Sequence, residues 1–169
     1  MAIGAVSLMP LTLALMVGVS TPAIAPTKAD AFQLQQIWKT KTLAKYANAD
    51  RLTDLQLVEL LSAVGFKGHD LREAWAVAKK ETHGNPLAHN GNRKTGDNSY
   101  GMFQINMLGS MGPIRREQFG LKSNSDLLNP VVNAQVAYHM SNGGKNWSAW
   151  KGMTPRTKYW LKHFPKTKA

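Results

Sequence analysis

Two stretches carry most of the information about the fold: Leu71-Arg72-Glu73-Ala74-Trp75-Ala76-Val77-Ala78-Lys79-Lys80-Glu81-Thr82 and, after a polar loop, Ser99-Tyr100-Gly101-Met102-Phe103-Gln104-Ile105-Asn106. The first predicts an apolar helix that ends near Glu81, because Gly84-Asn85-Pro86 prevents it from continuing. A carboxyl at such a helix end, facing a Gly-x-x-Gln-Ile segment, can act as the proton donor of a glycosidase. We expect partial burial against Trp75 or Phe103, which would raise the pKa of the Glu81 carboxyl and keep it protonated near neutral pH.

Three motifs carry a resemblance to a known group of proteins: Glu81-Thr82, Gly101-Met102-Phe103-Gln104-Ile105 and Asn129-Pro130-Val131-Val132-Asn133-Ala134. In this order they resemble the lysozyme-like lytic transglycosylases (the soluble lytic transglycosylase domain) and the goose-type lysozymes. The resemblance runs from about Leu52 to Trp150. Thr82 stands where the family usually has Ser, and it keeps a hydroxyl. The polar loop between the first two motifs is most similar to the corresponding loop of lysins carried by phages of actinobacteria and of their secreted relatives.

The resemblance implies a lysozyme-like α+β fold, mostly helical, with a small β-hairpin beside a substrate cleft. It also implies cleavage of the β-1,4 bond between N-acetylmuramic acid (MurNAc) and N-acetylglucosamine (GlcNAc) in peptidoglycan, with Glu81 as general acid and then base. No cofactor and no metal are implied, and the five histidines show no metal-ligand spacing.

Six further residues are expected to bind substrate: Thr82, Tyr100, Gly101, Gln104, Asn106 and Tyr138. Gly101 would let the backbone approach the sugar, and Gln104 can hydrogen-bond an N-acetyl or hydroxyl group. A structural amide that ties the loop to the helix is an equal alternative for Gln104. The resemblance places Tyr138 close to the catalytic carboxyl, and ordinary core packing is its alternative. Met102, Phe103 and Ile105 are expected in the core.

Asp97 is the candidate for a second carboxylate. Hydrolysis with inversion needs such a group to activate water, and Gly96-Asp97 precedes the Tyr-Gly-x-x-Gln segment much as an aspartate does in goose-type lysozymes. The alternative is an Asx-turn role, which the Gly-Asp-Asn-Ser setting favours. In lytic transglycosylases no second carboxylate is needed, because the C6 hydroxyl of the substrate is the nucleophile. We expect a transglycosylase and keep a hydrolase that uses Asp97 as the alternative.

Composition limits the other classes of function. The 169 residues include no cysteine, which excludes disulfides, thiolate metal sites and Cys-His catalysis. The net charge of +11 indicates an anionic partner, and bacterial peptidoglycan fits this. The basic residues form no nucleic-acid-binding motif, so specific nucleic-acid recognition is not expected.

The chain divides into an apolar segment (1–27), a linker that contains a helix around Phe32–Tyr46 (28–51), and the catalytic domain (52–165). Residues 1–27 carry no charged side chain, and Ala23-Ile24-Ala25 forms an Ala-x-Ala cleavage site. An export signal would place the protein outside the cell or in its envelope. Residues 1–25 are alternatively a membrane contact, and a virion-associated enzyme is a further alternative.

Helix boundaries follow from capping residues. Thr53 is expected to cap a helix that runs to about Ala63, and Asp70 the helix that ends near Glu81. Asn129 and Pro130 should open a third helix. Trp147 and Trp150 either stack on sugar or pack in the core. Two other functions remain open: a non-catalytic glycan-binding or virion structural module, and a chitinase-like glycosidase.

Overall fold

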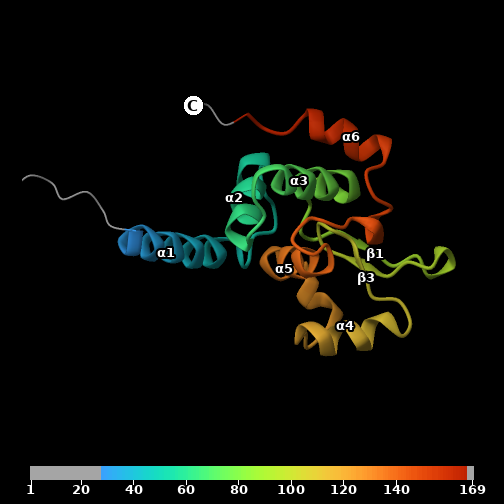
Figure 1. Ribbon diagram of the computed structural model, residues 1–169. Coiled ribbons are helices and arrows are strands. Elements are labelled where there is room, and N and C mark those ends of the chain that lie inside the picture. The colour runs from blue at the N-terminus through green and yellow to red at the C-terminus, as the bar shows by residue number, and fades with distance from the viewer. Residues whose placement is uncertain (1–27, 167–169) are drawn as a thin grey trace, which may run out of the picture.

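The computed structural model describes residues 28–166, and it is mostly helical (Figure 1). The expected export signal or membrane contact at the N-terminus lies outside these residues. The α-helices are α1 (Lys28–Tyr46), α2 (Asp54–Val64), α3 (Gly68–Thr82), α4 (Met111–Phe119), α5 (Pro130–Met140) and α6 (Pro155–Lys162). Short 3₁₀ helices are η1 (Arg93–Thr95), η2 (Asn124–Leu128) and η3 (Ser148–Trp150). Across this part of the chain no helix is long and apolar enough to span a membrane.

Three very short strands form one antiparallel sheet in the order β1 (His89–Asn90), β2 (Ser99–Tyr100) and β3 (Ile105–Asn106). Asn90 pairs with Ser99, and Ser99 pairs with Asn106. The sheet follows α3 directly and lies beyond its C-terminal end (Figure 1). The mostly helical α+β class is therefore confirmed, and the expected hairpin is part of this sheet.

α3 is the central helix, and its middle turns are fully buried from Ala74 to Ala78. Small alanine side chains allow neighbouring elements to approach closely, while Trp75 fills the space between α3 and α6 by edge contacts with Trp160 and Phe164. The helix ends at His83, which adopts a left-handed conformation at φ 57°. This ending fixes the position of Glu81.

Capping agrees with the sequence at two helices and differs at a third. Thr53 forms a capping box with Gln56 at the start of α2, and Asn129 accepts hydrogen bonds from the amides of Val131 and Val132 at the start of α5. The prediction that Asp70 caps α3 is wrong. The helix begins earlier, with Lys67 as N-cap, and the Asp70 carboxylate pairs with Lys145 instead at 2.5 Å.

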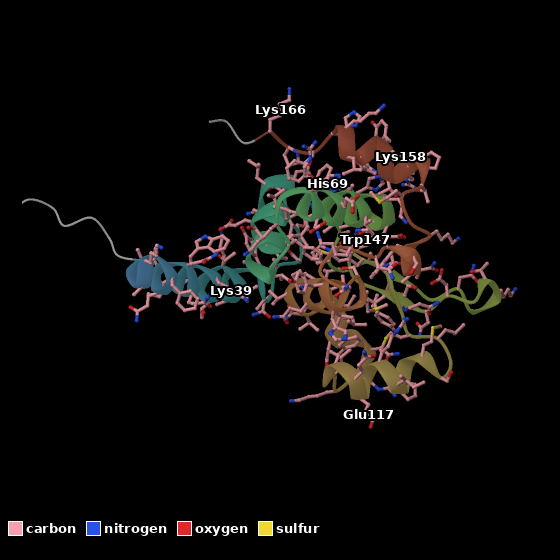
Figure 2. The ribbon with its side chains drawn as sticks, in the orientation of Figure 1. Lys39, His69, Glu117, Trp147, Lys158 and Lys166 are labelled. Carbon is pink, nitrogen blue, oxygen red and sulfur yellow. The ribbon has the colours of Figure 1, made fainter. Side chains whose placement is uncertain are left out.

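The core lies between α2, α3, α5 and the segment that follows β2. Met102, Phe103 and Ile105 are buried in it, as the sequence predicts. Trp147 and Trp150 are both buried at 5% exposure, and the Trp150 indole donates a hydrogen bond to the Phe103 carbonyl at 2.7 Å. Figure 2 shows Trp147 in the interior.

The buried side chain of Asn133 joins α5 to the loop that follows the sheet. It donates hydrogen bonds to the Tyr100 and Leu127 carbonyls. It also accepts one from the Phe103 amide. These three bonds hold the Gly101–Phe103 segment against α5.

Candidate active site

Glu81 is the next-to-last residue of α3, and its side chain is half-buried at 23% exposure. Its carboxylate Oε1 lies 2.6 Å from the ammonium of Lys80. That ammonium also donates to the Trp150 carbonyl at 2.8 Å. Lys80 thus ties Glu81 to η3, 70 residues further along the chain, and fixes where the carboxyl points.

A pocket of about 510 Å³ opens in front of this carboxyl. The helix end, the sheet and the segment from η3 to α6 each supply part of its wall. Its lining residues are Lys80, Glu81, Asn90, Asp97, Ser99, Gln104, Asn106, Ala149, Trp150, Lys151, Thr154 and Arg156. Amides and hydroxyls around a carboxyl form the kind of surface that binds a carbohydrate.

The aromatic residue beside Glu81 differs from the one that the sequence suggested. Trp75 is fully buried on the face of α3 that contacts α6, and Phe103 lies in the core. Neither lines the pocket, whereas Trp150 does. The periodicity of α3 turns Trp75 away from the face that carries Glu81. Packing of Glu81 against Phe103 stays a prediction.

Asp97 lines the same pocket as Glu81. One of its oxygens accepts a hydrogen bond from the Asn90 amide at 3.0 Å, and the other accepts one from the Ser99 hydroxyl. The Asp97 backbone amide donates to the Asn92 carbonyl at 3.1 Å. The structure therefore brings the two candidate carboxyl groups into one pocket and, at the same time, gives Asp97 a bracing role in the hairpin.

Gln104 and Asn106 reach the pocket as expected, and both also hold the loop. Gln104 adopts a left-handed φ of 48°, and its side-chain amide donates to the Gly101 carbonyl at 2.9 Å and to the Ala88 carbonyl at 3.3 Å. Asn106 donates to the Gly96 carbonyl at 3.0 Å. The Gln104 side chain thus has a structural role, although it joins two parts of the loop rather than the loop to the helix, and its contact with substrate stays a prediction.

Thr82 and Gly101 hold the frame of the site. The Thr82 hydroxyl donates to the Met102 carbonyl at 3.0 Å and accepts from the Asn85 amide at 3.1 Å, which fastens the helix end to the loop. Gly101 has φ 71°, and a Cβ there would overlap both the Asn133 amide nitrogen and the Leu127 carbonyl oxygen. The packing of Gly101 against α5 and η2 is therefore sufficient to require glycine.

The two tyrosines expected to bind substrate lie in different places. Tyr100 stacks on the ring of His89 in the sheet, with ring centroids 4.4 Å apart. Tyr138 packs edge-on against Phe66 at 4.9 Å and lines another pocket, beside α1 and α2. The structure thus does not bring Tyr138 into the Glu81 pocket, since its position on α5 faces α2.

Four pocket residues carry no signal that the sequence analysis detects: Lys80, Lys151, Thr154 and Arg156. Lys80 stands next to Lys79, and nothing in the sequence distinguishes the two. The structure separates them, because Lys79 turns to Asp54 at 2.8 Å and Lys80 turns to Glu81. The other three follow η3, where no motif marks them.

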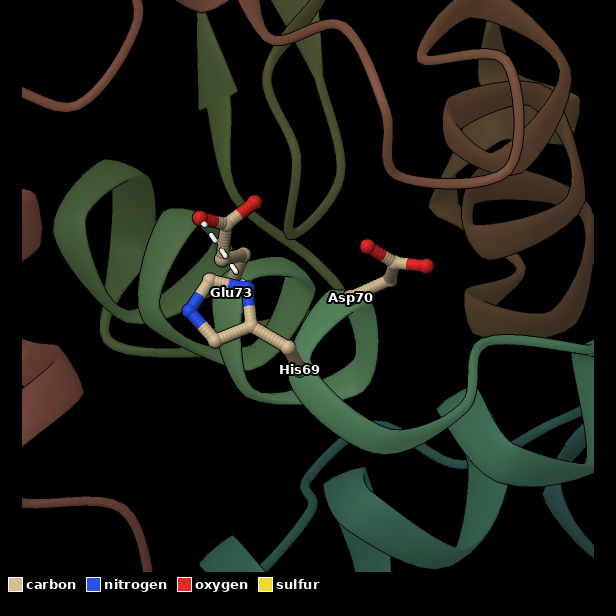
Figure 3. Close-up of side chains that lie close together, drawn as sticks. All are labelled: His69, Asp70 and Glu73. Carbon is tan, nitrogen blue, oxygen red and sulfur yellow. Dashed lines mark ion pairs between the residues drawn. The ribbon is translucent and has the colours of Figure 1, made fainter.

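Potential metal ligands gather at one place within residues 28–166. His69, Asp70 and Glu73 lie on the first turns of α3, with ligand atoms within 4.8 Å of one another (Figure 3). The His69 Nδ1 atom lies 3.5 Å from the Glu73 carboxylate, which also accepts a hydrogen bond from the Trp147 indole at 3.2 Å. The Asp70 carboxylate is paired with Lys145. Protein groups therefore already satisfy both carboxylates, at the end of α3 opposite to Glu81.

Comparison with known proteins agrees with this geometry. The family model described as "Lysozyme like domain" matches residues 58–152, a range that contains Glu81, the sheet and the whole of α5. No curated protein and no solved structure matches the chain. The matched range covers more than half of the chain, and the protein therefore belongs to the lysozyme-like domain family.

Proposed function

We propose that this protein is a peptidoglycan glycosidase that cleaves the β-1,4 bond between MurNAc and GlcNAc, with Glu81 as its general acid. Membership of the lysozyme-like family supports a glycosidase that acts on peptidoglycan. The observation that carries the residue assignment is the half-buried Glu81 carboxyl in a polar pocket of about 510 Å³. A carboxylic acid in this setting can protonate the oxygen of the leaving sugar.

The surrounding groups account for the binding of a glycan. Asn90 and Asn106 supply amides on the sheet side of the pocket, and Thr154 supplies a hydroxyl from the segment after η3. Lys80 holds the Glu81 carboxyl through its second contact with the Trp150 carbonyl. The scissile bond would lie between the sheet and η3, beside Glu81.

For the second step, we infer that the C6 hydroxyl of the MurNAc residue attacks C1, which makes the protein a lytic transglycosylase. Glu81, deprotonated after the first step, accepts the proton of that hydroxyl. The product carries a 1,6-anhydro bond. This assignment is supported by Asp97, whose two oxygens both accept hydrogen bonds inside the hairpin, a role that needs no catalytic task.

A hydrolase is the second candidate, and one specific observation favours it. Asp97 lines the same pocket as Glu81, so a water molecule between the two carboxyl groups could be activated by Asp97 while Glu81 protonates the leaving oxygen. Hydrogen bonds from Asn90 and Ser99 hold the Asp97 carboxyl in place at the pocket wall.

Replacing Glu81 by Gln tests the general acid. The amide cannot donate the required proton, so cleavage of purified peptidoglycan should fall by about a hundredfold to ten-thousandfold, the usual contribution of general acid catalysis. Glu117→Gln is a matched control, because Glu117 is exposed on α4, away from the pocket (Figure 2). A Glu81→Gln protein that clears cell walls at the parent rate contradicts the proposal. If the parent protein cleaves chitin but not peptidoglycan, the assigned substrate is wrong.

The masses of the released muropeptides decide the second step. Anhydro products from both the parent and Asp97→Asn are expected for the transglycosylase. Reducing-end products, heavier by one water, together with a large loss of rate in Asp97→Asn, would establish the hydrolase. A folded parent that retains peptidoglycan without cleaving it would instead be a glycan-binding module.

A further inference from the structure

A second pocket, of about 670 Å³, lies between α1 and the body of the domain. It is at the opposite end of α3 from Glu81. Asp70 borders this second pocket and Glu81 borders the first, about 16 Å apart along a helix that rises 1.5 Å per residue. α1 projects from the body beside it (Figure 1). A ligand in the second pocket would therefore leave the first pocket open.

The α1 wall of this pocket combines aromatic rings and amides. Phe32 and Trp38 line it although they are 61% and 41% exposed. Gln35, Gln36 and Lys39 line it from the same helix. Exposed aromatic faces beside amide groups offer both apolar contact and hydrogen bonds, which is the combination that a sugar ring requires.

The opposite wall is built around Tyr138. Gly65 and Gly143 flank its ring, and a Cβ at either position would lie 3.3 to 3.4 Å from the ring or its hydroxyl. The absence of side chains at both glycines leaves this edge of Tyr138 uncovered. Asn142 adds another amide to the lining. The wall is thus also aromatic and polar.

The charge of the pocket is positive. Its lining contains Lys39, Lys67 and Lys145 and one carboxylate, that of Asp70, which is already paired with Lys145. Neither Lys39 nor Lys67 forms an ion pair with a carboxylate whose side chain the structure describes. Lysines beside aromatic and amide groups complement a glycan that carries carboxylates.

We infer that this pocket is a second glycan-binding site, which holds a stretch of peptidoglycan away from the bond being cleaved. The identity of the ligand rests on the proposed function. We assign binding without cleavage to this site, whose Asp70 carboxylate is paired with Lys145. Its effect would be to keep the enzyme on insoluble wall between cleavage events.

A double variant, Phe32→Ala with Trp38→Ala, tests the site in a Glu81→Gln background that does not digest the wall. In sedimentation with insoluble peptidoglycan sacculi, its affinity should fall by about tenfold, the size of loss seen when aromatic anchors of a binding surface are truncated. The control is Leu34→Ala with Ile37→Ala, on the same helix at 61% and 50% exposure but outside the pocket lining. The affinity of this control for sacculi should match that of Glu81→Gln alone.

Two further measurements separate the alternatives. With Glu81 intact, Phe32→Ala with Trp38→Ala should cleave short soluble muropeptide fragments at the parent rate. Lys39→Gln with Lys67→Gln should weaken retention on sacculi and leave retention on uncharged chitin unchanged. Equal losses of affinity for sacculi in the test and control pairs would overturn the inference. It would also be overturned if the test pair lost binding to phosphatidylglycerol vesicles but bound sacculi as before. If Glu81→Gln still digests the wall, the proposed catalysis is refuted. The comparison of the test and control pairs would still stand, because both pairs carry the same Glu81→Gln replacement.

Discussion

Among the glycines of residues 28–166, Gly101 has the least room for a side chain. Its φ is 71°, and an added methyl group would come well within 3.0 Å of the buried Asn133 amide nitrogen and of the Leu127 backbone oxygen. Neither atom belongs to a flexible side-chain end, because Asn133 is held by three hydrogen bonds. The segment that carries Gln104 therefore depends on this glycine.

Gly101→Ala should lower the free energy of unfolding by about 2 to 4 kcal/mol, since it adds a clash to an unfavourable backbone conformation. Gly96→Ala is the matched control, because Gly96 has φ 74° and no heavy atom within 4 Å of the added Cβ. The control should lose only about 1 kcal/mol. Urea unfolding of both variants measures the difference, and equal losses would show that the loop moves aside.

Among the contacts between elements, a small polar cluster joins α1 to α2. Glu59 on α2 accepts hydrogen bonds from the Tyr46 hydroxyl and from the Lys45 ammonium at 3.1 Å, both on α1. The hydrogen bond from Tyr46 and then that from Lys45 lower the pKa of the Glu59 carboxyl, against the opposing effect of partial burial. The ionised carboxylate is thus the form that stabilises this joint.

Acid should therefore weaken the joint. Because the pKa of Glu59 is lower in the folded than in the unfolded protein, its contribution to stability is present above the unfolded value and is lost as pH falls through the folded value. The unfolding free energy of the parent should approach that of Glu59→Gln between about pH 5 and about pH 3. Denaturant unfolding across this range measures it, with Glu117→Gln as control. A constant gap between parent and Glu59→Gln would contradict the prediction.

At the scale of the whole molecule, the net charge is +11, and several of the lysines lie on outer parts of the fold. Figure 2 shows Lys39, Lys158 and Lys166 on separate outer elements. Such a distribution attracts an anionic polymer over a distance without defining one contact. It complements the two pockets, which supply the short-range contacts.

Retention on insoluble peptidoglycan should therefore weaken as salt rises. The distance over which exposed charges act falls from about 10 Å at 0.1 M to about 3 Å at 1 M salt. Sedimentation of Glu81→Gln with sacculi at several salt concentrations measures this, and uncharged chitin serves as the control surface. Retention on sacculi that does not change with salt would assign binding to uncharged contacts alone.

The local features of this protein can be predicted from its sequence. The helix end at Glu81, the Thr53 and Asn129 caps, and the burial of Met102 follow from periodicity, capping and chain-breaking residues, which act within a few positions. These features, together with the order of the motifs, also indicate the lysozyme-like fold. Asp70 is the exception, because a distant lysine competes for its carboxylate.

Which side chains share a pocket depends on the folded chain. Folding joins Lys80 to Trp150 across 70 residues, brings Thr154 and Arg156 into the pocket of Glu81, and turns Tyr138 toward α1. No spacing in the chain predicts these partners, because they depend on how α5, η3 and α6 pack around α3. The physical reason is that secondary structure is specified by neighbours in sequence, whereas a binding site is specified by neighbours in space.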